Sequence, residues 1–145
     1  MPALTLFEHF IEAMAHGKHN LASDTFKLAL TNTAPTAGTD ETFTPGSLHP
    51  PPAAVNGYTS GGETLSVTSA TQTSGVLKFI VADETITASG GDIGPFRYGI
   101  VYNDTASNDD LVGFVDYGSS VTIADGVDFQ FDLSESDGIA QISIV

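Results

Sequence analysis

A helical pattern of apolar residues opens the chain. The residues that recur at the spacing of one helix face, widened by a further aromatic, are Leu4, Phe7, Ile11, Met14 and Phe10. Thr5 and Glu8 stand in capping-box order, and Gly17 suits the left-handed position just past a helix end. We therefore predict one α-helix over residues 5–16. Because the chain shows no second helix pattern, we expect its apolar face to pack on a sheet or on a neighbouring subunit.

From residue 24 the apolar period changes to two, the period of a strand. Residues 24–31 alternate, with Phe26, Leu28 and Leu30 on one face. The second half of the chain alternates in the same way between turn residues. The strands predicted there are residues 64–70, 75–82, 84–88, 96–103, 111–117, 120–124, 127–133 and 139–145. Asp125-Gly126, between two of these strands, is typical of a hairpin turn.

Many short strands separated by such turns favour a mainly β fold. We predict an antiparallel β-sandwich or jelly-roll-like domain with one N-terminal α-helix. The length of 145 residues and the lack of an internal repeat indicate a single domain, residues 1–145. Its sandwich core is expected from residues 63–145 together with the strand at 24–31.

Residues 32–62 interrupt this pattern. They hold most of the prolines and little periodicity, and the run Pro50, Pro51 and Pro52 favours extended polyproline geometry. A segment of this length without periodicity is unusual inside a compact domain. We expect a long proline-rich arm that lies across a surface, with Phe43 and Leu48 as anchors.

Charge excludes several classes of function. The chain carries 18 acidic and 4 basic residues, a net charge of −14, which opposes binding to nucleic acid and to anionic membrane surfaces. It has no cysteine, which excludes disulfides, cysteine-ligated zinc and thiol catalysis. No apolar run approaches a membrane span, and no targeting signal is evident.

The acids are unevenly distributed along the chain. Residues 79–145 hold twelve of them and a single base, Arg97. We expect Arg97 to form an ion pair that orients its strand or a subunit contact. The remaining acids are interpreted as a solvated surface, with a polyvalent face for cations or a basic partner as the alternative.

Candidate metal ligands lack the spacing of known sites. The segments 103–110 and 132–138 are rich in oxygen ligands of the kind Ca²⁺ prefers, but neither has EF-hand spacing and a polar hairpin tip explains each as well. The histidines, which we interpret as surface or capping residues rather than zinc ligands, are His9, His16, His19 and His49.

No motif indicates an enzyme. The nucleophile-elbow, phosphate-loop and dinucleotide patterns are missing, and we expect neither catalysis nor a cofactor. A carbohydrate-active enzyme stays as a remote class of function, because two carboxylates that meet only in the folded chain leave no sequence pattern.

Several segments of the chain recur, in the same order, in one family. They are DTFKLAL at 24–30, GYTSGG at 57–62, RYGIVYND at 97–104, LVGFVDYG at 111–118, FQFD at 129–132 and Gly138-Ile139. Over nearly its whole length the chain resembles small virion proteins of tailed bacteriophages, often encoded among head genes. These motifs are structural and mark no active site.

The resemblance implies a capsid decoration (cement) protein on the outer surface of an HK97-type head. Its partner would be the major capsid protein. It would form a homo-oligomer, with a trimer expected, and it would be made in the cytoplasm of the bacterial host. The alternative is a tail or fibre component, or a host-surface binding module.

The helix and the arm are the expected contact segments, because neither has an obvious partner within one short chain. The expected interface residues are Leu4, Phe7, Phe10, Ile11, Met14, Phe43, Leu48, Pro50, Pro51, Pro52 and Arg97.

Overall fold

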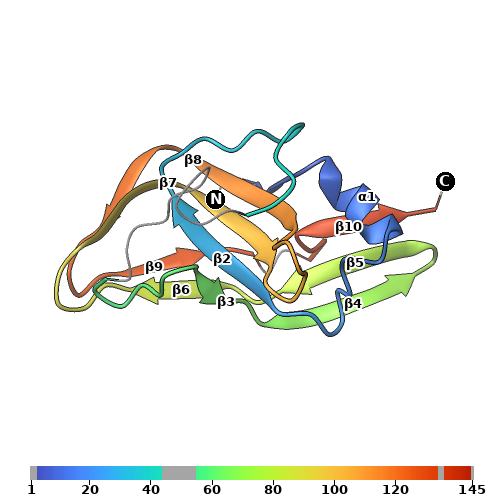
Figure 1. The fold of residues 1–145 in the computed structure, drawn as a ribbon. Helices are drawn as coiled ribbons and strands as arrows, with labels where there is room; N and C mark the ends of the chain where they lie inside the picture. The colour runs from blue at the N-terminus through green and yellow to red at the C-terminus, as the bar shows by residue number, and fades with distance from the viewer. Residues whose placement is uncertain (1–2, 44–54, 134–135, 145) are drawn as a thin grey trace.

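Two layers of antiparallel β-sheet and one short helix form the described part of the chain (Figure 1). The computed structural model describes residues 3–43, 55–133 and 136–144. The prediction of a mainly β, sandwich-like fold with one N-terminal helix is confirmed. No helix among the described residues is long and apolar enough to cross a membrane.

The first layer is a five-stranded sheet in the order β1-β8-β7-β2-β3. Its strands are β1 (Thr5–Leu6), β2 (Phe26–Thr31), β3 (Glu63–Thr64), β7 (Ile93–Asn103) and β8 (Leu111–Ile123). The second layer holds a three-stranded sheet, β10-β5-β4, beside the pair β6-β9 (Figure 1). Its strands are β4 (Val67–Thr73), β5 (Val76–Val81), β6 (Glu84–Thr87), β9 (Asp128–Phe131) and β10 (Ala140–Ser143).

The main core lies between the layers. Phe26, Leu28 and Leu30, the apolar face predicted for β2, are fully buried there. Phe96 sits at one end of this core, with its ring centroid 5.5 Å from that of Phe129 and 6.2 Å from that of Phe131. Aromatic pairs at such distances add attraction beyond the burial of their area.

A second, smaller core covers the other face of the five-stranded sheet. Ala29 of β2 and Ile100 of β7 are fully buried there, although their neighbours in sequence point into the main core. Phe7 and Phe43 supply the cover, both nearly buried. The centre of this sheet is therefore buried on both faces, and Phe7 and Phe43 belong to the layer that covers its outer face.

Aromatic side chains anchor the described parts of residues 32–62 to the sheet. Phe43 stacks on Tyr102 with ring centroids 4.2 Å apart, so the predicted Phe43 anchor is confirmed, whereas Leu48 lies outside the described residues. Tyr58 is a second anchor: its buried hydroxyl accepts a hydrogen bond from the Leu30 amide at 2.9 Å. Burial raises the pKa of Tyr58 to about 12, which keeps that hydroxyl neutral.

The helix is shorter than predicted. It spans α1 (His9–Ala15), and Thr5 lies in β1, opposite Phe114 of β8. The capping-box prediction is wrong, because Glu8 makes no capping hydrogen bond with its side chain. A strand edge offers Thr5 and Leu6 backbone partners that a first helical turn would leave unsatisfied. Gly17, at φ +72, ends the helix as predicted.

Two strand predictions are also wrong. The segments 111–117 and 120–124 form one continuous strand, β8. Asp125-Gly126 does not close a hairpin, because β9 leaves β8 and pairs with β6 in the other layer. The two-residue turn between paired strands is Ser74-Gly75, which joins β4 to β5 with φ of 52 and 81.

Candidate functional site

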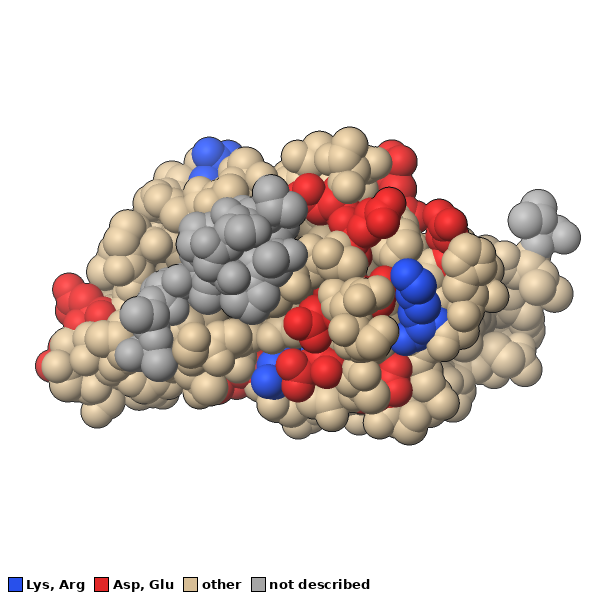
Figure 2. Space-filling model, in the orientation of Figure 1, with Lys and Arg blue, Asp and Glu red and all other residues tan. Residues whose placement is uncertain are grey.

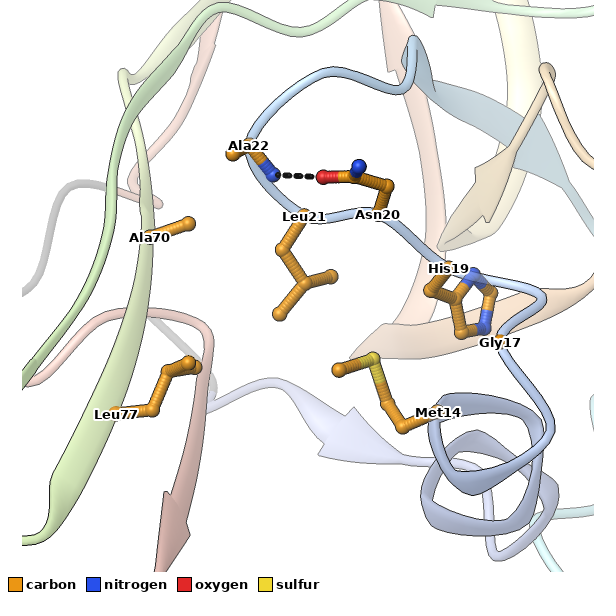
Figure 3. A pocket seen from close by; sticks show the side chains of 8 residues that line it. All are labelled: Met14, Gly17, His19, Asn20, Leu21, Ala22, Ala70 and Leu77. Atoms are coloured by element: carbon orange, nitrogen blue, oxygen red, sulfur yellow. Dashed lines mark hydrogen bonds between the residues drawn. The ribbon is translucent and has the colours of Figure 1, made fainter.

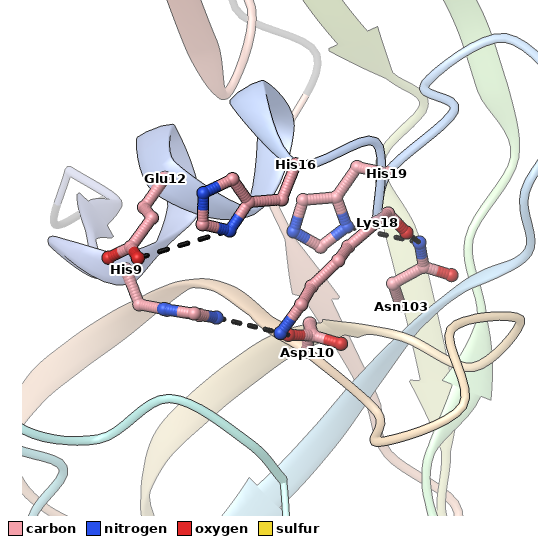
Figure 4. Close-up of polar contacts among 7 residues, drawn as sticks. All are labelled: His9, Glu12, His16, Lys18, His19, Asn103 and Asp110. Atoms are coloured by element: carbon pink, nitrogen blue, oxygen red, sulfur yellow. Dashed lines mark hydrogen bonds and ion pairs between the residues drawn. The ribbon is translucent and has the colours of Figure 1, made fainter.

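A cluster of polar side chains joins α1 to the loop between β7 and β8 (Figure 4). Asp110, at the start of β8, is 1% exposed and accepts hydrogen bonds from His9 Nε2 at 3.0 Å and Lys18 Nζ at 3.2 Å. Burial raises the pKa of Asp110, but the hydrogen bonds from His9 and Lys18 act against it, and the net pKa is lowered. Asp110 is therefore an ionised, paired carboxylate.

His19 and Asn103 form the buried side of this cluster. His19 Nδ1 lies 3.0 Å from Asn103 Nδ2, which also donates to Asp24 Oδ2 at 2.7 Å. Burial lowers the pKa of His19, although the charges of Asp110 and Asp24 oppose this shift. Because Asn103 Nδ2 is a donor, a neutral His19 accepts at Nδ1 and carries its proton on Nε2. Among the described residues, that Nε2 has no hydrogen-bond partner.

The cluster joins parts of the chain that are far apart in the sequence. A histidine bonded to a carboxylate, as His9 is to Asp110, is also the arrangement typical of a general base. The side chains of the cluster are His9, Lys18, His19, Asp24, Asn103 and Asp110. Their contacts join residues up to 101 positions apart and hold α1 against the start of β8.

The three described histidines lie at separate contacts. His9 and His19 bond to Asp110 and Asn103, and His16 lies 3.9 Å from Glu12 on the exposed side of α1 (Figure 4). His49 lies outside the described residues. Within the described ranges, no group of three or more His, Asp or Glu side chains could hold a metal ion.

The two oxygen-rich segments use their oxygens within the chain. Asn103 Oδ1 accepts from the amides of Thr105 and Ala106, which is the geometry of a polar turn. In the same loop Asp104 pairs with Lys27 at 3.1 Å. In the segment 132–138, whose residues 134–135 are not described, Asp137 pairs with Lys78 at 2.8 Å.

Arg97 forms the ion pair that the sequence predicts. From β7 it donates to both carboxylate oxygens of Asp116 in β8, through Nε at 2.8 Å and Nη2 at 3.0 Å. The guanidinium carbon also lies 5.2 Å from the ring centre of Tyr98. The pair raises the pKa of Arg97 and lowers that of Asp116. It ties β7 to β8, and a role of Arg97 at a subunit contact stays a prediction.

The expected interface residues are placed very differently by the fold. Phe7, Phe10 and Phe43 are 2–3% exposed, so the reasoning that they lack a partner within one chain is wrong for these three. Ile11 is 57% exposed, and Leu4 and Met14 are half-buried. The proline run, Pro50, Pro51 and Pro52, lies with Leu48 outside the described residues.

A sheet without acidic residues is the surface that sequence reasoning missed. The strands β4, β5 and β10 contain no Asp or Glu and one base, Lys78, in a chain with 18 acids; the acid beside Lys78 is Asp137, which reaches it from the loop before β10. Figure 2 shows acidic side chains gathered around the α1 end of one face of the molecule, with Lys or Arg side chains among them. The signal was present in the sequence, since segments 67–73 and 76–81 are conspicuously free of carboxylates.

Both faces of this sheet offer contact area. The outer face has a hollow of about 340 Å³, lined by Ser69, Thr71, Thr73, Val76, Lys78 and Ile80. On the inner face, a groove of about 410 Å³ separates Ala70 and Leu77 from Met14 and Leu21 (Figure 3). No family model matches the chain, and no match to it is found among curated proteins or solved structures.

Proposed function

We propose that this chain is a structural virion protein: a non-enzymatic capsid decoration protein that binds the outside of an HK97-type phage head and stabilises it. The resemblance in sequence motifs supplies the identity of the partner, the major capsid protein. The observation that carries the proposal is the separation of charge, with an acid-free sheet on a chain of net charge −14. Such a sheet is where a large partner can approach with the least electrostatic repulsion.

Attachment of this kind stabilises a shell by mass action. A protein that binds only the assembled lattice adds its binding free energy to the assembly, about 2.7 kcal/mol per site when its free concentration is 100 times Kd. The remaining acidic surface keeps the bound protein from adhering to the packaged genome or to anionic envelopes. The physical chemistry of the surface thus suits an exterior position.

The polar contacts support a non-enzymatic role. The pair that most resembles an acid–base dyad is His9 and Asp110, which hydrogen-bond to each other. Lys18 donates a further hydrogen bond to the same carboxylate. Arg97 and Asp116 likewise saturate each other on the surface of the sheet.

Co-sedimentation with expanded, empty phage heads that lack the protein tests the proposal. We expect saturable binding and a higher melting temperature of the shell. Thr71→Glu and Val76→Glu, on the outer face of the acid-free sheet, should weaken this binding by at least tenfold. Ser119→Glu adds the same charge on an exposed position of β8 and should leave binding unchanged.

Two outcomes would contradict the proposal. Failure to bind heads, combined with binding to host cells or to tails, would favour the tail, fibre or host-surface alternative. Equal weakening by the sheet variants and by Ser119→Glu would show that total charge, not this sheet, governs attachment. The expected trimer comes from the resemblance alone.

A further inference from the structure

The last described strand, β10, lies at an edge of the acid-free sheet, beside β5 (Figure 1). It pairs with β5 on one side, and no other described strand pairs with it. Proteins commonly protect such edges with charges, prolines or bulges. Residues 140–144 have no charge and no proline, and the register of β10 with β5 is regular.

The other edges of the described sheets are protected. The edge strands β1 and β3 are two residues long. In the pair β6-β9, each strand carries an acid, Glu84 in β6 and Asp128 in β9. The strand β4 is interrupted by a register shift between Val67 and Ser69. The edge of β10 is thus the least defended in the described part of the chain.

The hydrogen bonds of β10 define which backbone groups are free. The Ile144 amide donates to the Gly75 carbonyl at 3.0 Å, one position beyond the Ser143–Val76 pair. In an antiparallel ladder, successive residues direct their backbone groups to opposite sides. The N–H and C=O groups of Gln141 and Ser143 therefore point away from β5, toward the open edge.

Apolar side chains accompany this edge. Ala140, Ile142 and Ile144 alternate with Gln141 and Ser143, so they share the inner face of the sheet. Ile144 is 84% exposed, the most exposed large apolar residue among those described. A hollow of about 300 Å³ adjoins it, lined by Gln72, Gly75, Leu77, Ile142, Ser143 and Ile144.

We propose that β10 is a self-association site, at which the β10 strand of a second copy pairs antiparallel across a two-fold axis through Ile142. This register sets Gln141 of each copy opposite Ser143 of the other, so every free N–H and C=O of these residues gains a partner. It also sets Ile144 opposite Ala140 of the second copy, next to the hollow. The two three-stranded sheets become one continuous sheet.

The register argues for a second copy as the occupant, because it is self-complementary, as a two-fold contact requires. Two chains of net charge −14 repel each other, and β10 with its neighbours β5 and β4 is where they can meet without opposing carboxylates in the paired strands. The inference is independent of the proposed function and replaces the three copies that the resemblance implies with two.

Sedimentation velocity of the full chain over a range of concentrations tests the pairing. We expect a dimer in the wild type. Ser143→Pro removes an outward N–H that an edge strand can lose without unfolding, and it should weaken dimerisation by at least tenfold. Ile144→Asp changes an exposed side chain and should weaken it similarly, because it sets two carboxylates at the contact. Higher salt should strengthen the wild-type dimer by screening repulsion.

The matched control keeps the contact intact. Ser143→Ala retains the amide and should dimerise as the wild type does. A wild type that is monomeric or trimeric would overturn the pairing, and so would a dimer that persists in both Ser143→Pro and Ile144→Asp. A monomer that still binds phage heads would overturn only this inference. A dimer that does not bind phage heads would overturn only the proposed function.

Discussion

The buried carboxylate of Asp110 offers the sharpest test of the energetics. Asp110→Asn preserves the shape of the side chain but removes the negative charge of the carboxylate that accepts hydrogen bonds from His9 and Lys18. Across the 3.2 Å to Lys18 Nζ, at an effective dielectric constant of about 20, Coulomb attraction is roughly 5 kcal/mol before solvent screening. Lys18 is 36% exposed, so we discount this value strongly. We expect the free energy of unfolding to fall by about 2–3 kcal/mol, as for lost charge-assisted hydrogen bonds.

Urea unfolding followed by far-ultraviolet circular dichroism measures this change. Asp104→Asn removes the same charge from the exposed pair with Lys27 and is expected to cost about 0.5 kcal/mol or less. The pKa of Asp110 is lowered by folding, so its contribution is present above the usual pKa of 3.8 and is lost as the pH falls through the lowered value. The difference between wild type and Asp110→Asn should therefore shrink in acid. A difference below about 0.5 kcal/mol at pH 7, or one that grows in acid, would refute the reasoning.

Three further predictions concern stability. Gly62→Ala should lower the free energy of unfolding by about 2 kcal/mol or more, because Gly62 has φ +105 and the new Cβ would lie 2.5 Å from the Leu28 carbonyl oxygen. Gly118→Ala, whose Cβ would have nothing within 4 Å, should lower it clearly less in the same urea titration. Phe96→Ala should cost about 3–5 kcal/mol, and a loss under 1 kcal/mol in thermal unfolding would contradict its place in the aromatic core. Burial lowers the pKa of His19, so stability is full above about pH 6.5 and falls as the pH drops below it. His19→Gln should flatten the pH dependence between pH 7 and 5, and an unchanged slope would count against this.

The candidate contact surfaces show where reasoning from sequence failed. The helix face was expected at an interface because one short chain offered it no visible partner. The fold supplies that partner: Phe7 covers the outer face of the five-stranded sheet, and Phe10 packs into the main core. The spacing of apolar residues indicates that one face of a helix is buried, but it does not indicate whether the same chain or another chain covers that face.

The polar cluster could not be predicted for a related reason. His9 and Asp110 are 101 residues apart and carry no spacing signal, because they meet only where α1 crosses the start of β8. The pair Arg97–Asp116 was easier to anticipate, since Arg97 is the only base among the twelve acids of residues 79–145 and was expected to pair with one of them. Its partner, however, depends on the register of β7 with β8.

The amino-acid sequence by itself determined the class of the protein: mainly β, with one short helix that ends at Gly17, a strand at 26–31 and an overall acidic surface. These features follow from local periods, turn residues and charge, which act within a few positions. The tertiary structure alone decided that β9 pairs with β6 rather than β8, and that β2 is buried on both faces. It also decided that β10 is left with an open edge. Strand pairing joins residues far apart in the chain, so the free energy that selects it depends on the whole assembled core.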